Sequence, residues 1–550
     1  MVAKDVAYQP QVSGVQQPIP PTGEQSYPPV RDVTLGELLR EAARESGDRV
    51  ALVNGVADRA LRRRWTYAEL LREAETVAYA LLRRFQPGDR IAVCSANCPE
   101  WVILEFGAAL AGMIMVPANP AYREAELAAI LQDCEATALF HIDTWRSSAV
   151  GAIAASIRDT LMPDLALISF SDWDTFLASG AEPVPLPNVK PRDPVIIQFT
   201  SGTTGRPKGA MLHHGLIHPP ANVAVCCGFK RFGVWLNAMP MYHIGGAVVS
   251  LMATISVLGT FVQMREWDPG LALELIEAEG CNGMLLVPTM IVAMLDHPTF
   301  ADHDLSTVDF ILAGAAPVPP ALSERLTERI GCRTMICFGQ TEAGGPISNT
   351  ATGDGPHELA NTLGRPLPGM QLEIRDPATN ATLPPGEMGE MCIKSPQIML
   401  GYYGREDETR SAMTPDGWLR LGDLGMLDER GYVSITGRLK DMIIRGGINI
   451  YPREVEDVLF EHPSVAQAAV IGLPDDKWGE IVLAVAQSID GSPLRFEDLH
   501  QHCRDRLAGF KVPALWAQTD IFPMNPTGKI QKFVLNDWTR EGRLVPVSVR

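Results

Sequence analysis

The strongest chemical signal in the chain is a loop rich in hydroxyls and glycines. It follows the apolar run 195–199 and reads Thr200-Ser201-Gly202-Thr203-Thr204-Gly205-Arg206-Pro207-Lys208-Gly209. Glycine lets a backbone come close to an anion, and hydroxyl and backbone N–H groups can surround phosphate oxygens. Lys208 comes six residues after Gly202 and precedes a glycine, which is not the spacing of a Walker A loop. We therefore expect a phosphate-binding loop outside the P-loop ATPases, with an ordinary flexible loop as the alternative.

Two further strings carry groups suited to the rest of a nucleotide. The string Phe338-Gly339-Gln340-Thr341-Glu342 offers an aromatic side chain that could pack against a flat ring and a carboxylate for Mg²⁺ beside phosphates. Its glycine would allow a ligand to approach the backbone closely. Its alternative reading is a strand end followed by a helix cap. Asp423 follows Gly422 and could accept hydrogen bonds from both hydroxyls of a ribose, with Arg438 fifteen residues later. The alternative for Asp423 is a surface turn residue.

Two charged strings occur near the end of the chain. Residues 437–456 combine charged side chains, adjacent glycines and a proline that could start a helix, and could equally be a solvated linker. The string Asn525-Pro526-Thr527-Gly528-Lys529-Ile530 presents a lysine on a turn. Such a point charge suits a phosphate or carboxylate oxygen, although most lysines are simply exposed.

The elements that must position these residues follow an α/β pattern. Thr34 is a plausible N-cap for a helix, and short apolar runs at 90–96, 138–142, 165–170, 283–288 and 310–317 are typical of buried strands. Strands that alternate with helices predict a largely parallel sheet. Residues 371–436 are richer in short strands, with a hairpin turn at 428–431. A compact α+β pattern begins near residue 438.

Composition narrows the class of protein. The 550 residues are 46% hydrophobic and carry a net charge of −18, which favours a large folded core and argues against general nucleic-acid binding. Ten scattered cysteines without metal spacing indicate reduced thiols, so we expect a cytoplasmic protein.

Residues 1–33 are expected to form a disordered extension. The uncharged run 245–264 is expected to be a buried helix plus strand, not an integral membrane segment.

Taken together and in this order, the five strings resemble the adenylate-forming superfamily of acyl-CoA synthetases, amino-acid adenylation domains and beetle luciferases. The resemblance runs from about residue 34 to about 540. It implies two α/β subdomains and a β-barrel-like subdomain within residues 34–438, and a small mobile α+β domain over 439–550. It also implies the reaction: ATP and a carboxylic acid give an acyl-AMP and pyrophosphate, and the acyl group then passes to coenzyme A.

The resemblance implies roles for individual residues. The phosphates would be held by Thr200, Ser201, Gly202, Thr203, Thr204, Gly205 and Lys208. The adenosine would be held by Ala315, Ala316, Pro317, Phe338, Gly339, Asp423 and Arg438. Glu342 would bind Mg²⁺, Thr341 would lie near the α-phosphate, and Lys529 would bridge the acid and the α-phosphate. Lys440 would be the hinge, and Gly446 and Gly447 would line the tunnel for coenzyme A.

The acyl group would lie beside His243, which stands at the aromatic or histidine position of acyl-CoA ligases and could also be a merely packed histidine. The pocket would be formed by residues that are mostly small and leave room for a chain or ring: His243, Gly245, Gly246, Gly314, Gln340, Ala343 and Gly344. Leu421 departs from the Thr or Ser that commonly precedes Gly422.

These features predict an ATP-dependent acid–CoA ligase for a medium- or long-chain fatty acid or an aromatic acid. Its partners would be the acid, ATP with Mg²⁺ and coenzyme A, with a homodimer left open. The alternatives are an acyl-AMP ligase that loads a separate carrier protein, a luciferase-like oxygenase and a non-catalytic nucleotide-binding regulator.

Overall fold

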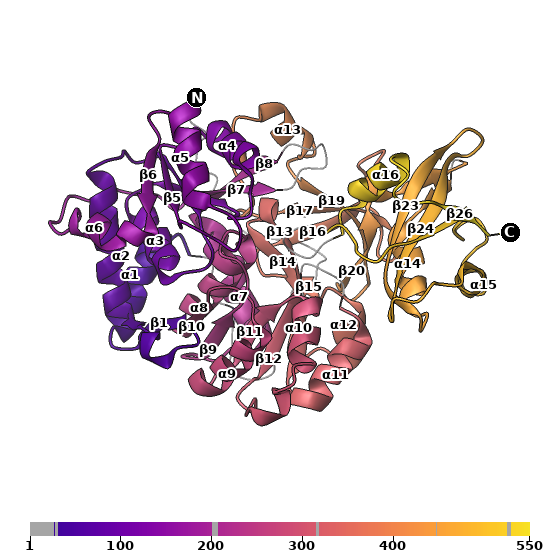
Figure 1. Ribbon diagram of the computed structural model, residues 1–550, viewed down its shortest axis with the longest axis horizontal. Helices are drawn as coiled ribbons and strands as arrows, with labels where there is room; N and C mark the ends of the chain where they lie inside the picture. Colours follow the sequence, from indigo (N-terminus) through magenta and orange to yellow (C-terminus); the bar gives the residue numbers. More distant parts are fainter. Residues whose placement is uncertain are drawn as a thin grey trace.

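The computed structural model describes residues 27, 31–200, 207–314, 318–446, 448–524 and 530–549. It has a large α/β body and a smaller C-terminal unit that stands to one side of it (Figure 1). Of the predicted N-terminal extension, Tyr27 and 31–33 are described. Tyr27 packs against the core, and its hydroxyl lies 3.4 Å from Cys226 Sγ.

Two mixed sheets form the body. The first has the order β18-β8-β7-β4-β3-β5-β6, with parallel pairing from β7 to β6 and antiparallel pairing at the β7–β8 hairpin. Its strands are β3 (Arg90–Cys94), β4 (Ile114–Ala118), β5 (Ala138–His141), β6 (Ala166–Ser169), β7 (Pro194–Thr200), β8 (Lys208–His213) and β18 (Gly401–Tyr402).

The second sheet has the order β15-β14-β13-β12-β11-β9-β10-β1-β2 and is parallel from β13 to β1. Its strands are β1 (Val50–Gly55), β2 (Arg64–Thr66), β9 (Val234–Asn237), β10 (Thr260–Met264), β11 (Gly283–Leu286), β12 (Phe310–Gly314), β13 (Arg333–Gln340), β14 (Gly345–Asn349) and β15 (Arg365–Pro366). In β12, Phe310 and Leu312 face one core while Ile311 and Ala313 face another. Both faces are buried, which explains the continuous apolar run.

Helices cover both faces of these sheets. Between the sheets lie α1 (Leu35–Ser46), α2 (Tyr67–Leu82), α3 (Pro99–Leu110), α7 (His218–Cys226) and α8 (Leu251–Ser256). α6 (Trp173–Ala178) packs against α2 on the same core. The remaining helices of the body are α4 (Glu124–Asp133), α5 (Val150–Thr160), α9 (Pro269–Glu279), α10 (Pro288–Leu295), α11 (Pro320–Ile330) and α12 (Pro356–Asn361). Thr34 caps α1 as predicted, with a reciprocal hydrogen bond to Glu37.

An antiparallel sheet, β16-β17-β19-β20, follows the body. It comprises β16 (Gln371–Arg375), β17 (Gly389–Lys394), β19 (Leu419–Leu427) and β20 (Val433–Arg438), with α13 (Glu406–Ser411) before β19. The predicted hairpin turn at 428–431 connects β19 to β20.

The C-terminal unit has its own sheet and its own cores. Its strands are β21 (Ile443–Arg445), β22 (Ile448–Ile450), β23 (Val465–Asp475), β24 (Gly479–Ser488), β25 (Leu515–Gln518) and β26 (Val547–Ser548), and its helices are α14 (Pro452–Phe460), α15 (Phe496–Arg504) and α16 (Lys532–Arg540). A short turn, Leu439–Asp441, connects β20 to this unit, and α14 packs against β20. The predicted fold class, a large α/β region with a small α+β C-terminal unit, is confirmed (Figure 1).

The uncharged run 245–264 forms a buried π-helical turn, Gly245–Ser250, followed by α8 and β10. This confirms the predicted helix plus strand. In the described part of the chain, no helix combines the length and hydropathy that crossing a bilayer requires.

Candidate functional site

The two ends of the phosphate-loop string lie opposite each other on the β7–β8 hairpin. Thr200 and Lys208 are register partners, and Thr200 Oγ1 donates a hydrogen bond to the Lys208 carbonyl at 3.4 Å. Predicted loop residues Ser201, Gly202, Thr203, Thr204 and Gly205 lie outside the described residues. The hairpin therefore fixes where the loop begins and ends, at the carboxyl edge of β7, where ligands of parallel sheets bind.

Glu342 lies where the second sheet meets the β7–β8 hairpin. It lies in a single turn, Thr341–Ala343, immediately after β13. Gly344 ends that turn with φ +77°, a left-handed conformation that favours glycine. Thr200 Oγ1 lies 3.5 Å from Glu342 Oε1, although the two residues are 142 positions apart. The structure thus brings together the first and second predicted motifs.

Tyr402 is a member of this group that the sequence did not reveal. Its hydroxyl donates a hydrogen bond to Glu342 Oε1 at 3.0 Å, and Lys208 Nζ lies 5.1 Å from the centre of its ring. Burial, and then the neighbouring Glu342 carboxylate, raise the pKa of Tyr402, so the phenol stays protonated and donates. Tyr402 belongs to β18, a two-residue edge strand, and no pattern in the sequence marks it.

The chemistry of this group suits Mg²⁺ bound together with phosphates. Glu342 contributes a carboxylate, and Thr200 contributes a hydroxyl 3.5 Å from it; both are hard oxygen ligands. Among the described residues, no group of three or more His, Cys, Asp and Glu side chains could hold a metal by itself. Mg²⁺ is often bound by one or two carboxylates plus substrate phosphates, and Glu342 fits that mode.

Asp423 and Arg438 form the second part of the site. They are register partners on β19 and β20, and Arg438 Nε lies 3.0 Å from Asp423 Oδ1. Asp423 is only 1% exposed and lies inside a strand, so it is not a surface turn residue. Gln340, the last residue of β13, donates a hydrogen bond from Nε2 to Asp423 Oδ2 at 2.6 Å. Gln340 was predicted to line the acyl pocket, and this contact with the predicted ribose group was not expected.

The predicted adenine segment is only partly described. Gly314 ends β12 and pairs with Cys337 of β13, while Ala315, Ala316 and Pro317 lie outside the described residues. Phe338 is half-buried against the core, and Gly339 is so close to the Gly345 carbonyl that a Cβ would lie 2.4 Å from it.

The segment of the predicted acyl pocket begins after β9. His243 Nδ1 accepts a hydrogen bond from Gly245 N at 3.1 Å, which fixes the ring at the start of the π-helical turn. A Cβ on Gly246 would lie 2.5 Å from the Pro240 carbonyl oxygen, and one on Gly344 would lie 2.4 Å from that of Gln397. At these two positions a side chain would therefore collide with a backbone carbonyl, so close backbone packing requires glycine there. Ala343 is fully buried.

Asn97 holds this segment in place and was not singled out from the sequence. Its Nδ2 donates hydrogen bonds to the carbonyls of Met239 and Met264, each at 3.0 Å, and its Oδ1 accepts one from Met241 N at 2.8 Å. Asn97 lies just beyond the carboxyl end of β3. A polar residue at that edge is the signal that could have found it.

The residues predicted to form the hinge and the coenzyme A tunnel lie at the start of the C-terminal unit. Lys440 is exposed in the turn that connects the two units. Gly446 has φ +59°, and a Cβ there would lie 2.9 Å from the ring of Trp478. Gly447 and Lys529 lie outside the described residues, so their predicted roles are not tested.

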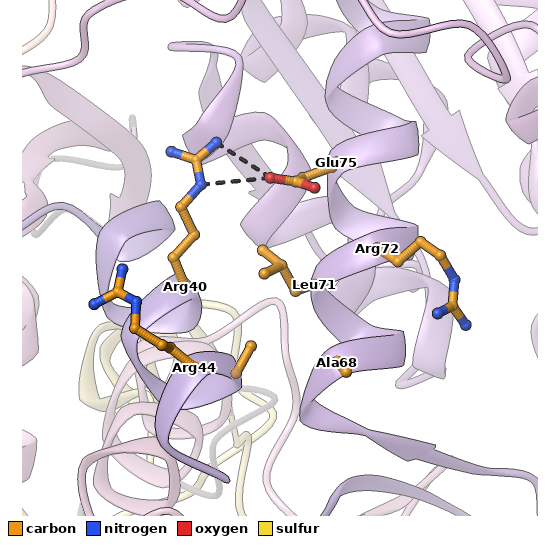
Figure 2. Close-up of a pocket in the computed structure, with 7 residues that line it drawn as sticks. Arg40, Arg44, Ala68, Leu71, Arg72 and Glu75 are labelled. Atoms are coloured by element: carbon orange, nitrogen blue, oxygen red, sulfur yellow. Dashed lines mark hydrogen bonds and ion pairs between the residues drawn. The ribbon is translucent and has the colours of Figure 1, made fainter. Parts of the chain in front are cut away.

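A surface hollow between α1 and α2 lies outside this site (Figure 2). It is lined by Arg40, Ala43, Arg44, Ala68, Leu71, Arg72 and Glu75. Arg40 and Glu75 are ion-paired across it at 3.3 Å, and none of its lining residues belongs to a predicted motif.

Comparison with known proteins gives a consistent picture. The model of the family "AMP-binding enzyme" matches residues 39–403, and that of its C-terminal domain matches residues 454–529. Feruloyl-CoA synthase of Amycolatopsis sp is 36% identical over 85% of this chain and 92% of its own. The mitochondrial medium-chain acyl-CoA ligase ACSF2 of Danio rerio is 31% identical over 93% of this chain and 89% of its own. The crystal structure of ATP-bound MatB from Rhodopseudomonas palustris superposes with a TM-score of 0.81 at 28% identity, covering 92% of this chain and 99% of that one.

Proposed function

The chain belongs to the family of AMP-binding enzymes, and from that premise we propose that it is an ATP-dependent acid–CoA ligase. In the first step a carboxylate oxygen attacks the α-phosphorus of ATP, the bond to the bridging oxygen breaks, and pyrophosphate leaves. In the second step the sulfur of coenzyme A attacks the acyl carbon, the thiol proton passes to water, and AMP leaves.

One observation carries this proposal. Residues of separate motifs, Thr200, Glu342 and the Asp423–Arg438 pair, come together at the carboxyl ends of β7 and β13. Gln340, the last residue of β13, donates a hydrogen bond to Asp423 of that pair, and Glu342 follows β13 directly. Under this proposal Glu342 would hold the metal–phosphate complex and the buried carboxylate of Asp423 would hold the ribose, one on each side of the end of β13.

The residues divide the chemistry between them. Attack of a carboxylate on a polyanion is electrostatically unfavourable, so cations must offset the charge. Lys208 would contact the outer phosphates and Lys529 the reacting oxygens, while Glu342 would hold Mg²⁺ with Thr341 beside the α-phosphate. Bound Mg²⁺ supplies charge neutralisation on the phosphate oxygens. Tyr402 would orient the Glu342 carboxylate through its hydrogen bond.

We also propose that the chain divides at residues 438/439 and that the unit 439–550 rotates about Lys440 between the two steps. Attack by the carboxylate and attack by the thiol need different groups at one carbonyl. The exposed position of Lys440 in a short turn between two separately packed units supports this proposal.

For the substrate we propose a fatty acid of medium or long chain or an aromatic acid. Relatives that cover most of the chain include one named for medium-chain acids and one named for an aromatic acid. The six residues of the π-helical turn are uncharged and buried, which supports an acyl group without charge at its far end.

The test is release of pyrophosphate from MgATP with a panel of short, medium, long and aromatic acids, with and without coenzyme A. We expect turnover that requires coenzyme A and produces AMP. Glu342→Gln should abolish it, whereas Glu266→Gln, an exposed partner of Arg146, should not. Pyrophosphate release without use of coenzyme A would instead indicate a carrier-protein ligase or an oxygenase. No turnover with any acid would contradict the proposal.

A further inference from the structure

The amide of Gln340 makes a contact that was not expected from the sequence. Its Nε2 donates to Asp423 Oδ2 at 2.6 Å and to the Leu421 carbonyl at 2.9 Å. A primary amide has two N–H groups, so both of its donors are used on β19. The shorter distance lies in the range of hydrogen bonds to charged acceptors.

The burial of Asp423 makes such a contact necessary. A carboxylate that is 1% exposed loses most of its hydration and needs hydrogen bonds or a cation to remain ionised. Arg438 supplies a cation at Oδ1, but its own side chain is 42% exposed and can move. Gln340 is held more firmly, because it ends a strand in the interior of the large sheet.

We propose that Gln340 is a positioning residue that holds Asp423 in the orientation required to accept hydrogen bonds from the ribose hydroxyls. The inference rests on the proposed function, since it takes Asp423 as the ribose-binding group. It also links the groups proposed for the two ends of the nucleotide. Gln340 ends β13, and Glu342 lies in the turn that follows it. The end of β13 would therefore position both Glu342, proposed for the metal–phosphate complex, and Asp423, proposed for the ribose.

One substitution and a matched control separate this role from a contribution to folding. Gln340→Met keeps the length of the side chain and removes both donors. The matched control is Gln263→Met, which also removes a buried amide donor, here to the Cys98 carbonyl at 3.0 Å, away from Asp423.

The experiment compares binding of AMP and of 2′,3′-dideoxy-AMP to the full chain by calorimetry. The ratio of the two dissociation constants isolates the ribose hydroxyls from changes in overall folding. We expect the wild-type protein to prefer AMP, and Gln340→Met to reduce that preference by about 10-fold or more, the usual effect of losing a hydrogen bond to a charged group. Gln263→Met should leave the ratio unchanged.

The possible outcomes test the positioning role of Gln340 separately from the proposed ligase function. If the wild-type protein releases pyrophosphate and prefers AMP, but Gln340→Met keeps the full preference, the positioning role is wrong and the proposed function stands. If the wild-type protein shows no preference for the ribose hydroxyls, Asp423 does not bind them, and the inference fails with that assignment. Absence of pyrophosphate release alone would contradict only the ligase reaction.

Discussion

The buried carboxyl group of Glu105 should make the stability of this protein depend on pH. Glu105 lies in α3, 1% exposed, and neither of its carboxyl oxygens has a hydrogen-bond partner among the described residues. Burial raises the pKa of this carboxyl well above its ordinary value of 4.5. The native state therefore keeps a proton that the unfolded chain releases.

The size of the effect follows from proton linkage. Between the unfolded and native pKa values of Glu105, the unfolded chain binds one proton fewer, so the free energy of unfolding falls by about 1.4 kcal/mol per pH unit. The stability contributed by the protonated carboxyl is fully present below pH 4.5 and is lost as the pH rises toward the native pKa. Glu105→Gln keeps the shape and removes the titration. As the pH rises above 4.5, its advantage over the wild-type protein should therefore grow, at most by about 1.4 kcal/mol per pH unit, until the native pKa is reached.

The assay is urea unfolding of the wild-type protein and Glu105→Gln at pH 5, 6 and 7, followed by circular dichroism. Glu266→Gln serves as the control, because Glu266 is exposed and its substitution should give no such trend. Because the chain has more than one unit, the comparison uses the shift of the transition between variant and wild type at each pH. Parallel behaviour of Glu105→Gln and the wild-type protein would show that Glu105 is ionised in the native state and would refute the reasoning.

The remaining predictions concern catalysis. Lys529→Ala should abolish formation of the acyl-adenylate and largely spare thioester formation from supplied acyl-AMP; equal loss of both steps, measured separately, would contradict its role. Lys440→Pro should spare pyrophosphate release and impair thioester formation, because proline fixes the backbone at the hinge; normal thioester formation would count against rotation. Tyr402→Phe should raise the Mg²⁺ concentration needed for half-maximal pyrophosphate release by about 3- to 10-fold, through loss of one hydrogen bond to Glu342. An unchanged Mg²⁺ requirement would show that Tyr402 does not orient that carboxylate.

Local features of the fold could be predicted because their causes are local. The helix that begins after Thr34 depends on a capping residue and on Glu37 three positions later. The hairpin at 428–431 depends on turn chemistry between two short strands, and the buried run 310–314 depends on apolar residues at both faces of a sheet. None of these requires knowledge of a distant partner.

The contacts that build the site could be predicted only in part. Individual groups, such as Glu342 and Asp423, were found from their chemistry and from a family resemblance. The hydrogen bond of Gln340 to Asp423 spans 83 positions and that of Tyr402 to Glu342 spans 60, and no periodicity encodes such pairs. The close approach of Gly246 to the Pro240 carbonyl also could not be predicted, because residue size alone does not reveal which backbone segment lies against a glycine.

The site draws one group from each of three sheets, and this explains why its geometry depends on the whole fold. Thr200 comes from the first sheet, Gln340 from the second and Asp423 from the antiparallel sheet. The two hydrogen bonds that connect these residues through Glu342 and Gln340 cross from one sheet to another. A nucleotide that contacts Thr200 and Asp423 at once would bind only where all three sheets are docked. Its binding would therefore stabilise their relative positions, since a ligand that binds only the assembled state favours that state.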